Sequence, residues 1–336
     1  MGRLMFVWLL GVGVSAAASS EPALKRFERT QTEMAVPIRI VLYAPDNATA
    51  QKALEAAFSR FHQLNAILSD YDPKSELRRL CDTSSEGHAV RVSDDLWRVL
   101  VRALELSERS DGAFDVTVSP VVHLWRSARR TKELPSPESL QRALSRVGYR
   151  SVRLDPARHT VALLKPNMRL DLGGIAKGYA VDEAMTALRK HGLTRVMVEA
   201  GGNIGLGEAP PERPGWRIGI APPDVRSPPR EYLWLSRCAI STSGDMWQYA
   251  IIDGKRYSHL IDPKTGMALT DRSSVTVVGP DGLSTDGLSS AVAILGPQKG
   301  LALVESTSHT AAFIVRMTNG KPTIYHSKRW QQLAHD

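Results

Sequence analysis

The stretch Asp171-Leu-Gly-Gly-Ile-Ala-Lys-Gly-Tyr-Ala-Val-Asp182 is the most informative part of this chain, because two glycines join a short apolar strand, predicted over 168–172, to a helix. Bare glycines at a helix start let backbone N–H groups approach a phosphate, and the helix dipole adds to the attraction. Lys177, on the first turn, can bring a positive charge to the same anion. Taken alone, the stretch fits a structural junction as well as a phosphate site.

The size and charge of the chain limit its class. It has 336 residues, of which 43% are hydrophobic and 23% charged, as in an ordinary globular protein with one large domain or two smaller ones. The net charge of +8 fits an anionic ligand, a nucleic acid or a membrane surface. The basic residues are dispersed, apart from short clusters such as 126–132, which are typical of a solvated face. The sequence shows no nucleic-acid-binding motif, so we expect no nucleic-acid partner.

The N-terminus has the pattern of a secretory signal peptide. Arg3 precedes an apolar run over 4–14, and small residues follow over 15–20. An apolar run of about eleven residues is too short to span a membrane comfortably, and no cysteine follows it that could carry a lipid. We therefore expect a signal peptide over 1–18, no stable membrane anchor, and an exported soluble protein, periplasmic if the source has two membranes.

The two cysteines, Cys81 and Cys238, lie in neither a CxxC motif nor a metal-ligand spacing. A disulfide between them is possible outside the cytoplasm, but two cysteines do not make a disulfide framework. Both are interpreted as structural residues, and their pairing stays open.

Apolar periodicity predicts a mixture of strands and helices. Strands are expected over 37–43, 195–199, 216–220, 249–252, 256–260 and 273–278, and helices over 49–68, 93–104, 174–192 and 283–295. Asp253-Gly254 and Asn319-Gly320 are typical hairpin turns. Hairpins beside long helices, without regular βαβ repetition, predict an α+β fold with antiparallel sheets. We expect one mature domain over about 30–330, either undivided or formed of two lobes.

Asp286 and Ser290 lie four residues apart on a predicted helix and therefore on one face. A carboxylate and a hydroxyl at that spacing can each give one oxygen to Mg²⁺, which completes its shell with water and phosphate oxygens. The alternative is that Ser284, Thr285 and Asp286 only cap the start of the helix.

His259 follows a predicted strand and precedes an Asp-Pro turn. A histidine near its neutral pKa could take a proton from an attacking hydroxyl. The alternative is a histidine that hydrogen-bonds to the backbone. Asp262 and Thr265 have an equally good explanation as turn residues, because Asp-Pro-x-Thr-Gly is favourable turn chemistry.

Taken together and in this order, several segments resemble the ApbE family of flavin transferases, the FAD:protein FMN transferases. Each segment is short, but seven in the same order over about 34–300 make the resemblance specific. The matching segments are Ser69-Asp-Tyr-Asp-Pro-Lys-Ser-Glu-Leu77, Gly112-Ala-Phe-Asp115, 171–182, Ala200-Gly-Gly202, Thr242-Ser-Gly-Asp245, His259-Leu-Ile-Asp-Pro-Lys-Thr-Gly266 and 284–291.

The resemblance implies Mg²⁺-dependent transfer of the FMN half of FAD to a Thr or Ser hydroxyl of an acceptor protein, with release of AMP. Mg²⁺ would be held by the Gly174 carbonyl, the Asp286 carboxylate and the Ser290 hydroxyl. His259 is the candidate base for the acceptor hydroxyl, although that proton could also pass to solvent. The residues that would surround FAD, the substrate, are Met34, Tyr71, Ala113, Phe114, Asp115, Asp171, Lys177 and Leu260.

Four positions depart from the usual pattern of the family. Ser290 stands where Thr is usual, which preserves the ligand oxygen. Asn203 replaces an Asp and Glu199 replaces an Asn, so that one carboxylate is expected to remain nearby. Asp70 replaces a common Thr and is expected to place a negative charge near the nucleotide.

Two alternatives to the transferase stay open. The same site could hydrolyse FAD to FMN and AMP, with water in place of the acceptor hydroxyl. The chain could also be an exported FAD-binding protein without turnover, although the intact metal and lysine positions favour catalysis.

Overall fold

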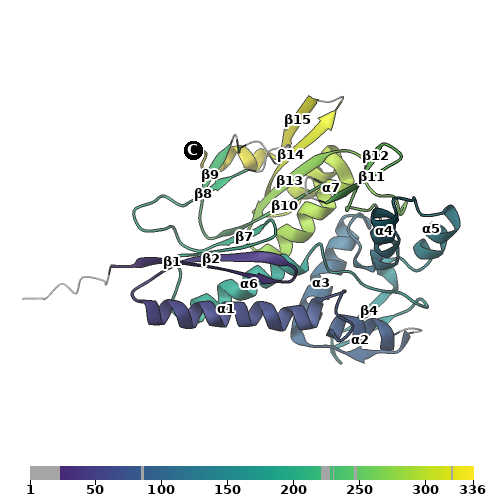
Figure 1. The fold of residues 1–336 in the computed structure, drawn as a ribbon, viewed down its shortest axis with the longest axis horizontal. Helices are drawn as coiled ribbons and strands as arrows, with labels where there is room; N and C mark the ends of the chain where they lie inside the picture. The colour runs from purple at the N-terminus through teal and green to yellow at the C-terminus, as the bar shows by residue number, and fades with distance from the viewer. Residues whose placement is uncertain (1–22, 85–86, 221–227, 230, 246–247, 319–320) are drawn as a thin grey trace, which may run out of the picture.

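An antiparallel sheet of eight strands forms the centre of the computed structural model, which describes residues 23–84, 87–220, 228–229, 231–245, 248–318 and 321–336 (Figure 1). The order is β1-β2-β6-β7-β10-β13-β14-β15, and every neighbouring pair is antiparallel. The predicted α+β class is confirmed. The strands are β1 (Lys25–Glu33), β2 (Val36–Ala44), β6 (Val196–Ala200), β7 (Asn203–Leu206), β10 (Cys238–Gly244), β13 (Ser273–Gly279), β14 (Ala311–Thr318) and β15 (Lys321–His326).

Three long helices cover one face of this sheet: α1 (Asn47–Leu68), α6 (Ala176–Lys190) and α7 (Gly282–Glu305) (Figure 1). The period of two along β2 explains the layering, because Ile38, Ile40 and Leu42 are buried with the helices, whereas Val41 is buried on the opposite face. The sheet is therefore buried on both sides in its central part.

The opposite face is covered by a small antiparallel pair, β8 (Trp216–Gly219) with β9 (Tyr232–Leu235), and by the 3₁₀ turn η4 (Lys328–Gln332) near the C-terminus. Trp216, Leu233 and Trp330 are buried there in one apolar cluster with Val41 of β2. This second cluster fixes the carboxyl end of the chain against the sheet.

A mostly helical region lies beyond the end of α1 (Figure 1). It contains the helices α2 (Glu76–Thr83), α3 (Asp94–Arg109), α4 (Ser119–Thr131) and α5 (Pro137–Leu144), the 3₁₀ turns η2 (Val116–Val118) and η3 (Tyr149–Ser151), the small sheet of β3 (Val90–Arg91), β5 (Thr160–Leu163) and β4 (Val152–Asp155), and the hairpin of β11 (Tyr249–Ile252) with β12 (Lys255–Ser258). Helix α4 packs on the β11–β12 hairpin, and the Trp125 Nε1–H donates to the Gly266 carbonyl at 2.7 Å.

Most of the predicted elements are confirmed. Ser93 caps α3 by accepting from the Leu96 N–H at 3.3 Å, and Gly192 adopts a positive φ of 78° just after α6. The turn at Asp253-Gly254 joins β11 to β12. Strands β14 and β15 pair as a hairpin, whose turn at Asn319-Gly320 lies outside the described residues, as does the signal peptide expected over 1–18.

The strand predicted over 168–172 is wrong. This segment is extended, but it joins no sheet: the Leu170 N–H donates to Cys81 Sγ, and the Asp171 N–H donates to the Val116 carbonyl. Met168, Leu170 and Leu172 are buried, which produces the alternation that indicated a strand. Cys81 and Cys238 are both free thiols, so they do not pair with each other.

Helix α7 is long and apolar enough to cross a membrane by length and composition. More than half of its most apolar window is buried inside the protein, where it packs against α6, β10 and β13. It bends at Gly296, which has a φ of 73° and precedes Pro297. We interpret α7 as the core helix of the domain.

Helices α6 and α7 cross very closely. A Cβ added at Gly178 would lie 2.0 Å from the Gly282 carbonyl oxygen and 2.7 Å from the Cβ of Asp286. Asp182 of α6 accepts from the N–H groups of Gly282 and Leu283 at 2.7 and 2.8 Å, so one helix also caps the other. The crossing therefore fixes the start of α7 against the first two turns of α6.

The substitution Gly178→Ala should lower the free energy of unfolding by about 3 kcal/mol, because the added methyl group meets backbone atoms that cannot rotate away. The matched control is Gly192→Ala, where nothing lies within 4 Å of an added Cβ. This variant should lose only about 1 kcal/mol of unfolding free energy, because the alanine must adopt the left-handed backbone conformation. Urea unfolding measures both. Equal losses in the two variants would contradict the close crossing.

Candidate active site

Every residue that the sequence predicts at the site lines one cavity of about 1220 Å³. The cavity lies between the helical region and the edge of the sheet layer where turns and helix starts meet. Its predicted residues are Met34 in the β1–β2 turn, Tyr71 after α1, Ala113, Phe114 and Asp115 before η2, Asp171, Gly174 and Lys177 at the start of α6, His259 and Leu260 after β12, and Asp286 and Ser290 on α7.

Asp286 does not cap its helix, so that alternative is wrong. Asp281 is the N-cap of α7 and accepts from the Ser284 N–H at 2.7 Å. Asp286 instead faces α6, where its Oδ2 accepts from the Gly178 N–H at 2.9 Å. The other carboxylate oxygen makes no hydrogen bond to the described residues, and the side chain is 4% exposed at the cavity wall. A buried carboxylate with a spare oxygen favours a cationic ligand.

The Ser290 hydroxyl and the Gly174 backbone lie side by side. A Cβ added at Gly174 would be 3.2 Å from Ser290 Oγ and 3.3 Å from the Phe114 ring, so glycine keeps this space open. Ser290 Oγ also lies 3.3 Å from the hydroxyl of Ser243 on β10, which orients it.

These oxygens fit the donor set of a hard cation. The described residues contain no cluster of three or more His, Cys, Asp or Glu side chains that could hold a metal ion. A site built from Asp286, Ser290 and the Gly174 carbonyl would have one carboxylate, one hydroxyl and one carbonyl. Such a small number of protein ligands is usual for Mg²⁺, because phosphate and water oxygens complete its octahedral shell.

Lys177 lies at the same end of the cavity. Its Nζ donates to the Gly173 carbonyl at 2.8 Å, which leaves ammonium protons for a ligand. No side chain caps the start of α6 at Ile175, so N–H groups of its first turn lack an intrahelical partner. The positive end of the helix and the ammonium together favour an anion.

An ion network that the sequence did not reveal forms the wall next to Tyr71. The Arg126 guanidinium donates to Asp70 at 2.6 Å and to Asp171 at 3.1 Å, and it lies 4.2 Å from the centre of the Tyr71 ring. Asp171 also accepts from the Gly173 N–H at 2.8 Å. Burial and the Asp70 carboxylate raise the pKa of Asp171, whereas Arg126 opposes that shift.

This network changes the interpretation of Asp70. The carboxylate does lie at the cavity, as its replacement of Thr led us to expect, but its charge is paired with Arg126. The only sequence signal for Arg126 was the basic cluster over 126–132, which had the appearance of a solvated face. Arg129, one turn further along α4, lines the same cavity without a hydrogen bond or ion pair to any described residue.

Asp115 has mainly a structural role. Its Oδ1 accepts from the N–H and hydroxyl of Thr117 at 2.8 and 2.6 Å, and its Oδ2 accepts from the Tyr149 N–H at 2.9 Å. The carboxylate thus closes the loop that presents Ala113 and Phe114 to the cavity.

His259 makes the backbone hydrogen bond of one sequence interpretation and keeps a free ring nitrogen, as the interpretation as a base requires. Its Nδ1 lies 3.1 Å from the Gln248 carbonyl oxygen, which assigns the ring proton to Nδ1 and leaves Nε2 as a proton acceptor. Burial lowers the pKa of His259 to about 4, and the nearby Arg129 and Lys177 act in the same direction. The ring is therefore neutral at physiological pH. Asp262 and Thr265 form the predicted turn, with hydrogen bonds between their side chains and to Lys264.

Glu199 does not replace the missing carboxylate beside Asn203. Glu199 does not line the cavity and lies 3.6 Å from Arg39. Its neighbour Ala200 pairs with Asn203, so Glu199 is on the face of the sheet opposite to Asn203. Asn203 is 2% exposed and lines the cavity, and its Oδ1 has no hydrogen-bond partner among the described residues. An unpaired buried amide oxygen indicates a donor on the ligand.

The turn that carries Met34 is strained. Met34 and Ala35 have φ values of 50° and 61°, a type I′ hairpin turn formed without glycine. Such a backbone is costly for residues with side chains and is concentrated at functional sites.

The comparisons with known proteins agree with this geometry. The model of the ApbE family matches residues 34–314. The FAD:protein FMN transferase of Haemophilus influenzae is 33% identical over 280 residues, which cover 81% of each chain. That of Vibrio cholerae is 34% identical over 275 residues, 80% of this chain and 81% of the relative.

Solved structures give the same result. The flavin transferase ApbE from Vibrio cholerae superposes with a TM-score of 0.84 at 28% identity, over 92% of this chain and 99% of the other. The apo flavinyl transferase ApbE from Pseudomonas stutzeri gives 0.82 at 29% identity, over 93% and 98%. The resemblance noted in the sequence is confirmed, and the chain belongs to the ApbE family, in which these relatives are flavin transferases.

Proposed function

We propose that this chain is an FAD:protein FMN transferase that moves FMN from FAD to a Thr or Ser hydroxyl of an acceptor protein and releases AMP, with Mg²⁺ bound at Gly174, Asp286 and Ser290. The observation that carries the proposal is one cavity in which the Asp286–Ser290 oxygens, the cations Lys177 and Arg129, and neutral His259 all meet. That combination suits a diphosphate under attack by a hydroxyl.

The cavity has the size and charge for a dinucleotide. Its volume of about 1220 Å³ exceeds the usual range for a drug-sized ligand. Tyr71, which is 73% exposed, and Phe114 offer aromatic surfaces for ring systems. Lys177 would offer positive charge to a diphosphate, as would Arg129, which has no hydrogen bond or ion pair with the described residues.

The reaction exchanges one P–O bond for another. The acceptor oxygen forms a bond to the FMN phosphorus while the bond from that phosphorus to the AMP oxygen breaks, and AMP leaves with the bonding electron pair. His259 Nε2 takes the proton of the acceptor hydroxyl. Bound Mg²⁺ would supply charge neutralisation at the phosphoryl oxygens. Lys177 adds a fixed positive charge beside the departing phosphate.

Hydrolysis of FAD is the nearest alternative, because water can use the same base and the same anion site. A binding protein without turnover is less consistent with this cavity, since simple binding does not require a neutral histidine beside a carboxylate–hydroxyl pair. Acceptor labelling separates the first two functions, and release of AMP separates both from the third.

We also propose export. The pattern of residues 1–18 supports removal of a signal peptide, leaving a soluble protein in the periplasm with a single transferase domain over about 30–330. Mass spectrometry of the protein purified from its native compartment would test this, because retention of residues 1–18 contradicts it.

The experiment that tests the function is mass spectrometry of a Thr-bearing acceptor fragment after incubation with the mature chain, FAD and Mg²⁺. We expect a mass gain equal to FMN less water, together with equimolar AMP, and loss of both with EDTA. AMP and free FMN without labelling would favour the hydrolase, and absence of AMP with several acceptors would refute catalysis.

Asp286→Asn should lower Mg²⁺-dependent AMP release about 100-fold or more, because it removes the negative charge from the proposed Mg²⁺ ligands. The amide keeps an oxygen that can accept from the Gly178 N–H. Thermal unfolding should change little. Asp286→Ala provides the comparison, because it also leaves that N–H without its acceptor, so only this variant should lose stability. Unchanged turnover in Asp286→Asn would contradict the metal assignment.

His259→Asn keeps a donor near the Gln248 carbonyl but removes Nε2, so turnover should fall by about 10² to 10⁴ while FAD affinity is retained. In the wild type, His259 is the deprotonated base above its pKa of about 4, so kcat/KM should fall only as pH is lowered through about 4. Collapse of FAD affinity would make His259 a binding residue. An acid limb near pH 6.5 would contradict the lowered pKa.

Arg126→Gln should weaken FAD binding about tenfold or more, because Asp70 and Asp171 are left as unpaired carboxylates in the wall. Asp70→Thr should have a small effect alone and should restore part of the affinity in the Arg126→Gln background. Flavin fluorescence titration of the four proteins gives the coupling energy. Additive losses would show that Arg126 and Asp70 are not coupled.

A further inference from the structure

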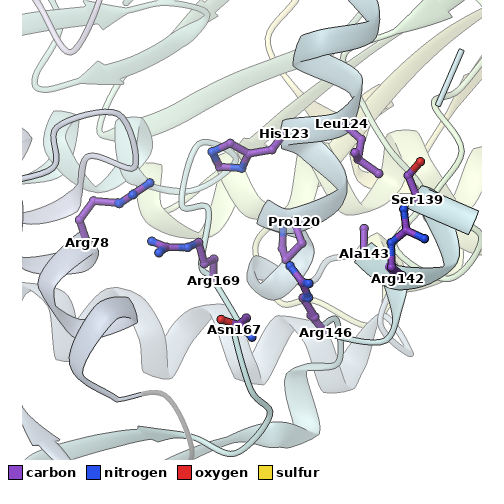
Figure 2. Close-up of a pocket in the computed structure, with 10 residues that line it drawn as sticks. All are labelled: Arg78, Pro120, His123, Leu124, Ser139, Arg142, Ala143, Arg146, Asn167 and Arg169. Atoms are coloured by element: carbon purple, nitrogen blue, oxygen red, sulfur yellow. The ribbon is translucent and has the colours of Figure 1, made fainter. Parts of the chain in front are cut away.

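A second pocket, of about 510 Å³, lies between α2, α4, α5 and the extended segment around Arg169 (Figure 2). We call it the basic pocket. None of the described residues that line it is acidic. Its cationic lining residues are Arg78, Arg142, Arg146 and Arg169, with His123 beside them.

Three of these side chains converge. Figure 2 shows the guanidinium groups of Arg78 and Arg169 and the ring of His123 pointing toward a common space. Arg78 Nε and Arg169 Nη1 are buried and have no hydrogen-bond partner among the described residues. A buried N–H without an acceptor is costly, and an anionic oxygen would make a charge-assisted hydrogen bond to it.

The two other arginines are available as well. The His123 ring is held by its own helix, since its Nδ1 lies 2.8 Å from the Ser119 carbonyl oxygen, and it is not counted among the cations. Arg142 and Arg146 are exposed, lie four residues apart, and have no side-chain hydrogen bond or ion pair within the described chain. Two carboxylates of the described chain act on this charge. Asp82 pairs with Arg169 at 2.7 Å, and Glu138, one turn before Arg142, interacts with it electrostatically without an ion pair or hydrogen bond.

The basic pocket lies next to the large cavity in which we propose that FAD binds, and which we call the nucleotide cavity. Helix α4 and the segment over 169–171 contribute to both. Helix α4 presents His123 to the pocket and Arg126 to the cavity. Arg169 lines the pocket and Asp171 the cavity, and two residues of extended chain span only about 7 Å. Arg78 donates to the Asp70 carbonyl at 3.2 Å, and Asp70 in turn holds Arg126.

We propose that the basic pocket binds an acidic side chain of the acceptor protein and so docks the acceptor beside the nucleotide cavity. This proposal rests on the proposed function, in which FAD fills the cavity and the acceptor must be held by the surface next to it. A pocket separate from that cavity, partly open and edged by exposed arginines, suits a carboxylate that projects from another protein. The net charge of +8 would steer such a partner.

The test compares two double variants of equal charge. Arg142→Gln/Arg146→Gln removes two cations from the basic pocket. Arg130→Gln/Arg153→Gln removes two exposed arginines that line neither cavity and have no side-chain hydrogen bond or ion pair within the described chain. The acceptor is the protein labelled in the mass-spectrometric experiment, used as it is and with carboxylates near its labelled residue changed to amides.

We expect the pocket variant to raise the acceptor KM about tenfold, with kcat, the KM for FAD and AMP release without acceptor unchanged within about twofold. The control variant should behave as the wild type does. The amide-substituted acceptor should have the raised KM with the wild type and no further rise with the pocket variant. An unchanged acceptor KM, or a raised KM for FAD, would overturn the proposal.

Inorganic phosphate gives a readout that does not depend on transfer. Calorimetry should show phosphate binding to the wild type and the control variant and at least tenfold weaker binding to the pocket variant. In the wild type, phosphate should compete with the acceptor but not with FAD. Absence of phosphate binding would overturn the anion site, whereas phosphate binding without acceptor labelling by any protein would refute the transferase and, with it, the acceptor as occupant.

Discussion

The close crossing of α6 and α7 is the constraint on which the site depends. Gly178 and Gly282 let the two backbones approach, and the Gly178 N–H then binds Asp286 directly. A carboxylate of one helix is thereby fixed beside the positively polarised start of the other. Lys177 and Gly174 lie on that same start, so one contact aligns the oxygens and the ammonium that face the diphosphate in the proposed reaction.

Charge pairing forms the rest of the cavity wall. Two carboxylates, Asp70 and Asp171, share Arg126, and the same guanidinium supports the Tyr71 ring. Arg129 and Lys177 offer positive charge to a ligand. Burial keeps His259 neutral by lowering its pKa, and these two cations act in the same direction. The charges of Asp70, Asp171 and Arg126 therefore stabilise the wall, whereas those of Arg129 and Lys177 are available to an anionic ligand.

Local patterns predicted much of the fold. The period of two in β2 and the helical spacing of α1 identified both elements, since each buries one regular face. The buried segment over 168–172 has the same alternation, but its backbone groups find partners in a cysteine and a 3₁₀ turn rather than in a strand. Alternation reports burial, and it does not say which groups accept the hydrogen bonds.

Residues that line the large cavity were predictable where a motif contained them, as with Asp286, Lys177 and His259. Arg126 and Arg129 were missed, because their importance comes from partners distant in the chain, or from the lack of one. Asn203 was noted only as a departure from the family pattern, and its unpaired oxygen is visible only in the structure. The position of Glu199 shows the same limit: a carboxylate one strand position away faces the opposite side of the sheet. Helix α4 has a consequence for how such an enzyme can diversify. Since one of its faces borders the large cavity and another borders the basic pocket, residues on the second face can be exchanged in evolution without a change to those that line the large cavity.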